Sequence, residues 1–381
     1  MKNINDYYCS QKFWWLSVDI EKGQASSCCS ALPHNIDLTS DLFNSEILIT
    51  ERRQMLNNQP VESCKQTCWI PESEGRISRR QILNSTEITH TQLENDPEIL
   101  NVLMGKQCNL NCVYCSKNYS SSWAKDLLDN GDYVGLNDSR YKLETKDKIF
   151  INLSHSTIQN SNRTVSILEK IYELSKSATI KKVIVSGGEP FLYNALSTLV
   201  NKFKCPVEIY TGLGINERRF QNELMKFDKN VSLVISAETT GKVYEFIRTG
   251  NSWKRFLNNL EYLNKTKIDY GFSSTISNLT IFDISNFLNM FPTSEIKWNI
   301  CSDPIFLQLH NLDYTSKDTI LNNIDFYPQG LKDIIINNLN VQPNPYIQKD
   351  LKIFILQFCD RNKLDLSVFP MSFVNWIKNV V

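Results

Sequence analysis

Three cysteines fall within one short segment of the chain, Gly105-Lys-Gln-Cys108-Asn-Leu-Asn-Cys112-Val-Tyr-Cys115. At this C-x3-C-x2-C spacing one loop can wrap a face of a cubane cluster, and thiolates are the soft ligands that iron–sulfur centres need. Because three ligands serve four irons, one iron keeps an open coordination position, as in catalytic metal sites. A zinc site would need a fourth ligand nearby, and no histidine falls between residues 91 and 154. The triplet therefore predicts a reactive iron–sulfur centre.

A second candidate site is the segment Gly187-Gly188-Glu189-Pro190, which follows an apolar run that is typical of a buried strand. In a parallel α/β sheet, ligands bind at the carboxyl ends of strands, and glycines there let the backbone approach a ligand closely. Glu189 is then placed to meet a cationic amine. Any tight strand-to-helix turn could use the same residues. The position of this segment downstream of the cysteine loop is what favours a binding role.

Further thiols precede this region: Cys9, Cys28, Cys29, Cys64 and Cys68. Residues 12–27 predict two short strands joined by a turn at Gly23, which places Cys9 and Cys28 at the open ends of a hairpin and close in space. Cys64 and Cys68 are spaced one helical turn apart on one face. Four thiolates complete a metal site, and zinc is the alternative to iron–sulfur because four paired cysteines also suit zinc. Cys29 is the alternative to Cys28, which lies nearer the hairpin end.

Short β-branched runs predict the strands that position these motifs. They are residues 98–103, 181–187, 207–212, 231–237, 269–275 and 295–300. Amphipathic segments lie between them, with apolar stripes predicted to face the core at Val165, Leu168, Ile171 and Leu174, and at Trp253, Phe256, Leu257, Leu260 and Leu263. The alternation indicates βα units around a parallel sheet, and six units are too few to close an eight-unit barrel. Residues 84–97 are expected to form a linker, and residues 117–162 a long irregular insertion.

Composition excludes several classes of function. The 41 basic and 41 acidic side chains cancel, so no global positive field attracts phosphate backbones or anionic lipid. No stretch approaches the roughly 18 consecutive apolar residues of a membrane span, and the amino terminus lacks the apolar core of a signal peptide. Clustered cysteines in a chain of 381 residues favour metal binding over disulfides. We therefore expect a cytoplasmic globular protein that binds neither nucleic acid nor membranes.

Over residues 98–300 the chain resembles the radical S-adenosylmethionine (radical SAM) family. Cys108, Cys112 and Cys115 match its C-x3-C-x2-C motif, with Tyr114 as the aromatic residue before the last cysteine, and residues 187–190 match its GGEP motif. The resemblance implies a [4Fe–4S] cluster on the three cysteines and S-adenosylmethionine on the open iron. It also implies a partial (β/α)6 TIM-like barrel of the α/β class, in agreement with the six predicted strands.

The resemblance assigns further contacts with S-adenosylmethionine. The GGEP motif around Glu189 contacts the methionine amino group, and Tyr114 lies near the adenine. Ser236 and Glu238 resemble the family's contact with the ribose, and Arg248 is placed to pair with the methionine carboxylate. A solvated glutamate and a surface arginine are the alternatives for the last two.

The order of hairpin and helix, with four cysteines, resembles the auxiliary-cluster module called twitch, a shortened relative of the SPASM domain. Residues 68–79 (CWIPESEGRISR) resemble the sequence that follows the last ligand of that module. The resemblance implies a second [4Fe–4S] cluster on Cys9, Cys28, Cys64 and Cys68, although here the module precedes the radical domain and usually it follows. The expected domains are residues 1–90 for the auxiliary cluster, 98–300 for the partial barrel, and 301–381 for an extension that packs on the barrel.

The chemistry implied by the family is reductive cleavage of S-adenosylmethionine to a 5′-deoxyadenosyl radical, which abstracts hydrogen from a substrate. A flavodoxin- or ferredoxin-type protein is the expected electron donor, and no side chain is assigned as catalytic. The auxiliary module favours a peptide or protein substrate. A small-molecule dehydrogenase or epimerase, and a non-catalytic iron–sulfur or zinc protein that senses redox state, are the alternatives.

Overall fold

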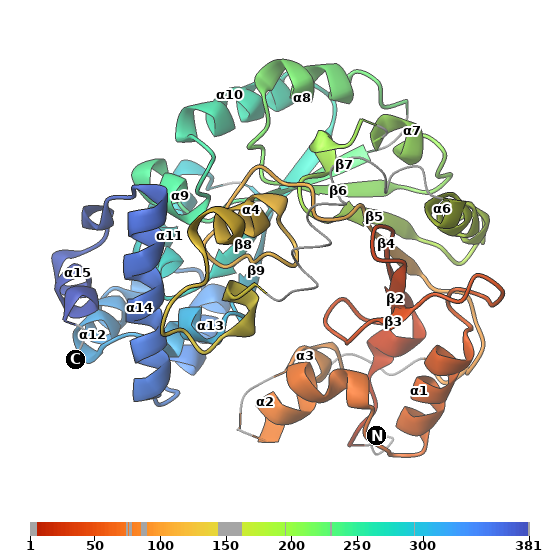
Figure 1. Ribbon diagram of the computed structural model, residues 1–381, viewed down its shortest axis with the longest axis horizontal. Coiled ribbons are helices and arrows are strands. Elements are labelled where there is room, and N and C mark those ends of the chain that lie inside the picture. Colours follow the sequence, from red (N-terminus) through yellow and green to blue (C-terminus); the bar gives the residue numbers. More distant parts are fainter. Residues whose placement is uncertain are drawn as a thin grey trace. The chain divides into compact units, whose positions relative to one another are not determined.

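The computed structural model describes the chain over residues 6–73, 75, 78–84, 90–143, 162–194, 196–228, 231–292 and 294–379 (Figure 1). The chain divides into two compact units. The first comprises Met1–Gly105, Ser154–Ile209 and Lys226–Ser232, and the second comprises Lys106–Leu153, Tyr210–Met225 and Leu233–Val381. The boundary between them passes through two strands, β6 and β7, so these units are not the segments expected from the sequence, whose limits stay a prediction.

The first unit is built on strands in the order β3-β2-β1-β4-β5-β6. Their bounds are β1 (Trp15–Asp19), β2 (Gln24–Ser26), β3 (His34–Asn35), β4 (Ile99–Leu103), β5 (Lys182–Ser186) and β6 (Val207–Thr211). Strands β4, β5 and β6 pair in parallel. The central three residues of β4 and of β5 are all buried, which is typical of a parallel strand that is covered on both faces. These strands confirm the ones predicted near residues 98–103, 181–187 and 207–212.

The amino-terminal hairpin continues this sheet. Strands β1 and β2 pair antiparallel with Ser17 opposite Ser26, and Gly23 in the connecting turn has φ of +63°, a conformation that glycine adopts without steric cost. Strand β1 also pairs in parallel with β4, with Trp15 beside Ile99. The sequence predicted the hairpin correctly but gave no sign that it would extend the sheet of the βα units.

The helices of the first unit are α1 (Glu46–Leu56), α2 (Ile70–Ser73), α3 (Arg79–Asn84), α6 (Asn162–Leu174) and α7 (Leu196–Val200). In α6 the predicted core stripe is wrong in part. Val165 is exposed, and Thr164, Ile167 and Ile171 are buried. Both faces have helical spacing and share Ile171, so the surface against which a helix packs decides which face is buried.

The second unit holds most of β7 (Val231–Ser236), then β8 (Asp269–Ile276) and β9 (Ile296–Ile300), in that order. Strands β8 and β9 pair in parallel with Phe272 beside Ile296, and all three confirm predicted strands. Its helices are α4 (Ser121–Asn130), α8 (Glu217–Leu224), α9 (Gly241–Ile247), α10 (Trp253–Asn264), α11 (Ile284–Met290), α12 (Tyr314–Asn322), α13 (Gln329–Leu339), α14 (Pro345–Asn362) and α15 (Met371–Lys378). The fold is thus an α/β partial (β/α)6 TIM-like barrel with an open sheet.

Helix α4 shows that the prediction of an irregular insertion over residues 117–162 is wrong for Ser121–Asn130. Ser120 caps the helix by accepting a hydrogen bond from the backbone N–H of Trp123, a common cap for the first turn. Trp123 is fully buried and stacks on Phe354 and Phe358 of α14. The segment is therefore part of the core of the second unit. Residues 144–161 lie outside the described part of the chain.

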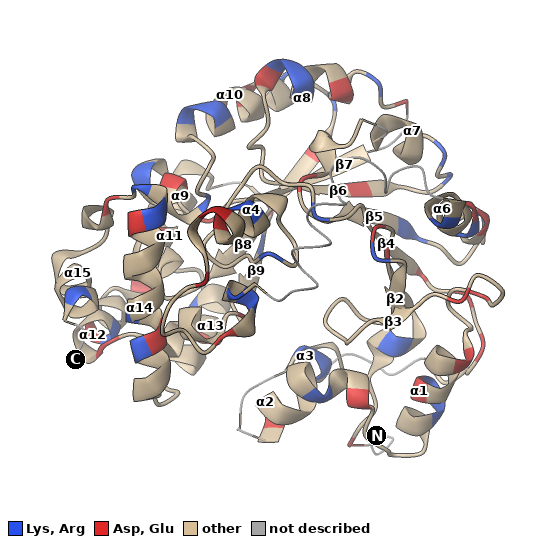
Figure 2. Ribbon diagram, viewed as in Figure 1, with Lys and Arg blue, Asp and Glu red and all other residues tan. Residues whose placement is uncertain are grey.

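Charged residues of both signs share the same helices. Figure 2 shows basic and acidic positions interspersed along α8 and α14, in agreement with the net charge of zero. Neither helix presents a surface of one sign, which nucleic acid binding would favour. Within the described residues, the structure contains no helix with the length and apolarity that a membrane crossing needs.

Candidate functional site

The cysteine triplet lies in the loop after β4, and backbone hydrogen bonds within the second unit fix the course of this loop. The N–H of Asn111 donates to the carbonyl of Thr249 over 2.8 Å, and the N–H of Val113 donates to the carbonyl of Ile247 over 2.9 Å. The cysteine loop therefore runs beside the residues that follow α9. Because Arg248 lies between the two acceptors in the sequence, this pairing sets it beside the thiols.

Two side chains of helix α4 form hydrogen bonds with the same loop. The N–H of Cys108 donates to Oγ of Ser121 over 3.0 Å, and the indole Nε1 of Trp123 donates to the carbonyl of Cys112 over 3.0 Å. Sequence reasoning missed this role, because residues 117–162 show only weak periodicity. The one signal that could have found it is Ser120 ahead of Trp123, Ala124 and Leu127, which is the pattern of a capped amphipathic helix.

Arg248, Glu238 and Tyr114 form one buried cluster. Nη2 and Nε of Arg248 lie 2.7 Å and 3.2 Å from the two carboxylate oxygens of Glu238, and the hydroxyl of Tyr114 donates to Glu238 over 2.9 Å. The guanidinium carbon lies 5.0 Å from the centre of the Tyr114 ring. Nη1 of Arg248 donates to Sγ of Cys112 over 3.8 Å. The cluster thus joins the cysteine loop to the end of β7, where Ser236 is half-buried.

The charges of this cluster compensate one another in a dry environment. Burial by itself would lower the pKa of Arg248, but Glu238, with smaller contributions from Tyr114 and Cys112, more than offsets it, so the pKa is raised well above its ordinary value. Burial raises the pKa of Tyr114 well above its ordinary value and that of Cys115 to about 12. Burial also raises the pKa of Cys112, although Arg248 opposes the shift. Metal binding at these thiols must therefore release protons.

The donor set is one that a cubane cluster can use. Among the described residues, no three His, Cys, Asp or Glu side chains are gathered closely enough to hold one metal ion. Each cysteine of a cubane binds a different iron, so its thiols need not converge on a point as zinc ligands must. Gly250, with φ of +97°, lets the backbone approach the loop, because a Cβ there would lie 2.8 Å from the carbonyl oxygen of Asn109. The residues present therefore fit a [4Fe–4S] cluster.

The GGEP segment lies at the carboxyl end of β5 in the first unit. Gly187 has φ of +122°, and a Cβ there would lie 2.7 Å from the carbonyl oxygen of Gly105, so only glycine fits. The N–H of Gly188 donates to that same carbonyl over 2.8 Å. Glu189 is buried, and its carboxylate accepts a hydrogen bond from the N–H of Phe191 over 3.3 Å. The turn therefore fixes a buried carboxylate at a strand end.

In the amino-terminal region, Cys9, Cys64 and Cys68 form one buried cluster with Met55 and Val61. Cys64 ends the 3₁₀ turn Glu62–Cys64, and Cys68 lies in the π-helical turn Lys65–Trp69 that follows it. Burial raises the pKa of Cys9 to about 11, and the neighbouring Cys64 adds to the shift. The structure thus brings together three of the four thiols assigned to the auxiliary cluster.

Cys28 lies in a different set of contacts. Its thiol donates to Oε1 of Gln11 over 3.5 Å and accepts from the N–H of Ser30 over 3.4 Å. Cys29 is more exposed, and Nε2 of Gln11 donates to its sulfur over 4.0 Å. A hydrogen bond from Cys28 and the charge of Arg79 lower the pKa of Cys29 to about 5. The choice between Cys28 and Cys29 as a ligand stays a prediction.

Replacing Arg248 with Met is expected to destabilise the second unit by about 3–5 kcal/mol, because Glu238 would remain as an uncompensated buried charge. The double variant Arg248→Met/Glu238→Gln should recover most of that loss, since it removes both charges. Urea unfolding of the three proteins measures the difference. Arg218→Met, at an exposed position on α8, is the control and should change stability by less than about 0.5 kcal/mol. Equal effects at residues 218 and 248 would contradict the prediction.

The chain was compared with curated proteins, with solved structures and with models of protein families. No curated protein matches the chain. The chain is similar to a solved structure described as native anSMEcpe with bound AdoMet and Cp18Cys peptide, with a TM-score of 0.38 and 16% identity over 63% of this chain and 61% of that one. It is also similar to Streptococcus suis SuiB bound to precursor peptide SuiA, with a TM-score of 0.37 and 14% identity over 87% of this chain and 70% of that one.

The chain thus spans about three fifths of the length of the first of these structures. The family model described as the Radical SAM superfamily matches residues 102–290. That range includes the cysteine triplet, the GGEP segment and the cluster around Arg248. Residues 102–290 of this chain therefore match the model of the Radical SAM superfamily.

Proposed function

We propose that this protein is a radical SAM enzyme that reductively cleaves S-adenosylmethionine and abstracts hydrogen from a peptide or protein substrate. One observation carries the proposal: within the matched segment, the buried Arg248 and Glu238 pair stands against Cys112 of the C-x3-C-x2-C loop. A structural zinc loop has no need of a buried guanidinium beside its thiols. A site that binds the carboxylate group of a cofactor does.

Cys108, Cys112 and Cys115 would hold the [4Fe–4S] cluster that the superfamily implies. When bound and reduced, the cluster supplies one electron to S-adenosylmethionine, which yields the 5′-deoxyadenosyl radical. Arg248 uses Nε and Nη2 for Glu238 and directs Nη1 toward Cys112. We assign it the methionine carboxylate, because Glu238 holds the guanidinium in one orientation and a fixed planar fork suits a carboxylate.

The remaining side chains orient the cofactor and exclude water from it. Glu189, held at the end of β5, is assigned to the methionine amino group together with Gly187 and Gly188. Tyr114 and Ser236 are assigned to the adenosine end. Tyr114, Arg248 and the backbone N–H of Thr275 already donate to Glu238, so a ribose contact by Glu238 would share that carboxylate with three protein residues.

Glu189→Gln is expected to weaken S-adenosylmethionine binding about tenfold or more and to leave the cluster absorption unchanged. A charge-assisted hydrogen bond contributes roughly 1.5–3 kcal/mol, and the amide removes the charge while keeping the shape. Isothermal titration of the anaerobically reconstituted chain measures the affinity. Glu208→Gln, which removes a 17% exposed carboxylate paired with Lys182 on β5, is the control. An affinity equal to that of the parent would remove Glu189 from the site.

We assign a second [4Fe–4S] cluster to Cys9, Cys28, Cys64 and Cys68. The burial of Cys9, Cys64 and Cys68 in one cluster supports three of these ligands. With four protein thiolates this cluster has no open iron, so its role is electron transfer or stabilisation of the fold. A flavodoxin- or ferredoxin-type protein is the proposed electron donor.

The experiment that tests the function is anaerobic incubation of the reconstituted chain with dithionite and S-adenosylmethionine, followed by measurement of 5′-deoxyadenosine. Release of this product supports radical chemistry, and its absence would leave only the non-catalytic alternative. Incubation with candidate peptides that carry deuterium then shows whether deuterium enters 5′-deoxyadenosine. Transfer from small polar molecules alone would favour a small-molecule dehydrogenase or epimerase.

A further inference from the structure

A buried lysine occupies the centre of the amino-terminal thiol region. The side chain of Lys12 is 1% exposed, and its Nζ lies 2.6 Å from Oε2 of Glu51 and 3.0 Å from Oγ of Ser63. Ser63 donates in turn to Oε1 of Glu51 over 2.5 Å, and Ser27 donates to Oε2 of Glu51 over 3.4 Å. The segments of Lys12, Ser27 and Ser63 therefore meet at the Glu51 carboxylate of α1, and Lys12 also bonds directly to Ser63.

Three of these segments carry the thiols. Cys9 immediately precedes the 3₁₀ turn that contains Lys12, Cys28 follows Ser27, and Cys64 follows Ser63. Lys12, Ser27 and Ser63, which make the hydrogen bonds described above, therefore each lie close in sequence to a cysteine. The fourth segment, α1, contributes Glu51 and no cysteine.

The electrostatics of Lys12 point to anionic neighbours. Burial by itself would lower its pKa, yet negative charge at Cys64 and at Glu51 raises the pKa above its ordinary value, with a smaller contribution from Cys28. A buried ammonium is costly unless it is paired, and here its surroundings contain thiols in addition to one carboxylate. The positive charge of Lys12 therefore lies near thiols that would become thiolates when they bind a metal.

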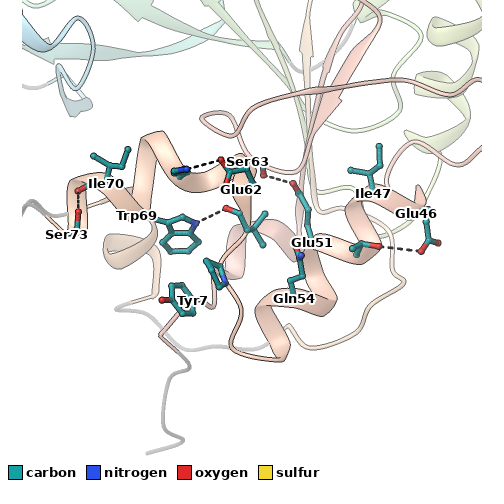
Figure 3. A pocket seen from close by; sticks show the side chains of 14 residues that line it. Tyr7, Glu46, Ile47, Glu51, Gln54, Glu62, Ser63, Trp69, Ile70 and Ser73 are labelled. Carbon is teal, nitrogen blue, oxygen red and sulfur yellow. Dashed lines mark hydrogen bonds and ion pairs between the residues drawn. The ribbon is translucent and has the colours of Figure 1, made fainter.

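Glu51 and Lys12 are not equally exposed to water. Glu51 lines a cavity of about 710 Å³ together with other residues of α1 and of residues 60–73, and Figure 3 shows it directed toward Ser63. Its side chain is 13% exposed. At Cys64 the positive charge of Lys12 lowers the pKa more than the negative charge of Glu51 raises it, although burial raises this pKa overall.

We propose that Lys12 is a positioning residue of the amino-terminal thiol site, where its buried ammonium, bonded to Ser63 and to Glu51, helps to join the thiol-bearing segments and compensates the thiolates of Cys64 and Cys28 when metal binds. This inference rests on the second cluster site that we proposed above. It adds to that site a residue that does not bind the metal itself. It also distinguishes two roles for a buried ion pair. A purely structural pair can be replaced by a neutral one at little cost, but a counter-charge cannot.

The test uses the full chain with Cys108, Cys112 and Cys115 replaced by Ala, so that only the amino-terminal thiols can bind. In this parent, Lys12→Met removes the charge, and Lys12→Met/Glu51→Gln removes both charges and keeps a hydrogen-bonding group beside Ser63. Lys22→Met, an exposed lysine in the turn of the same hairpin, is the matched control. Zn²⁺ affinity is measured by competition with a chelator, and stability by thermal unfolding of the metal-free proteins.

We expect both Lys12 variants to bind Zn²⁺ about tenfold more weakly than the parent and the Lys22 control. We also expect the double variant to recover the stability that Lys12→Met loses. Recovery of both stability and Zn²⁺ affinity in the double variant would show that Lys12 is only a partner of Glu51, which overturns the inference and leaves the auxiliary site in place. A parent that binds neither Zn²⁺ nor iron would overturn the auxiliary site itself, and the inference with it.

Discussion

Replacing Cys108, Cys112 and Cys115 together with Ala is expected to abolish 5′-deoxyadenosine release and to remove about half of the iron. The parent, purified without oxygen, should contain about eight iron atoms per chain in two [4Fe–4S] clusters, and the variant about four. The loss of activity should be complete within detection, because the three thiols are the protein's proposed ligands for the cluster that supplies the electron. Iron analysis and chromatography of the reaction mixture measure the two effects.

A control for the loss of thiols as such is Cys205→Ala/Cys359→Ala, at two half-buried cysteines outside both proposed sites. This variant should keep its iron and its activity. A parent with about four iron atoms would contradict the second cluster while leaving the first. A triple variant that still releases 5′-deoxyadenosine would contradict the assignment of the radical site to this loop.

Replacing Trp123 with Ala is expected to destabilise the second unit by about 3–5 kcal/mol, which is the usual cost of removing a large buried aromatic side chain. Trp123 is fully buried, and its ring centre lies 6.2 Å from that of Phe354 and 5.5 Å from that of Phe358. Its indole also donates to the carbonyl of Cys112. The substitution therefore opens a cavity and frees the cysteine loop, so iron content should fall with stability.

The variant Trp123→Phe separates these two effects. It keeps an aromatic ring in the core and loses the indole donor, while the Cys112 carbonyl still accepts from the N–H of Cys115. We expect it to lose about 1 kcal/mol from the missing hydrogen bond, and more where the smaller ring leaves space. Urea unfolding followed by circular dichroism gives the stabilities. If Trp123→Ala unfolds at the same urea concentration as the parent, α4 is not part of the core.

The sequence alone predicted the strands of the barrel and the motifs at their ends. Strands β5, β7 and β9 lie within one residue of the predicted limits, because alternation of side chains and β-branched runs are properties of neighbouring residues. The cysteine triplet could be recognised for the same reason, since its ligand spacing lies within one loop. The glycines of the GGEP turn likewise reflect a local backbone conformation, with Gly187 at φ of +122°.

The cluster around Arg248 could be predicted only in part. Sequence reasoning selected Tyr114, Glu238 and Arg248 and assigned each to a different part of S-adenosylmethionine. The structure shows that the three side chains bind one another. More than a hundred residues separate Tyr114 from Glu238, and a pattern of residue types carries no information on how side chains share a buried volume.

Only the tertiary structure decided the features that depend on contacts between distant segments. Strand β1 joins β4 across about eighty residues of chain, α4 packs on α14 through Trp123, and α6 buries Thr164 in place of Val165. Lys12 is a further case, because a lysine in a sequence is expected at the surface. In each case a local pattern allows several faces or partners, and the free energy of burial against the rest of the chain selects one of them.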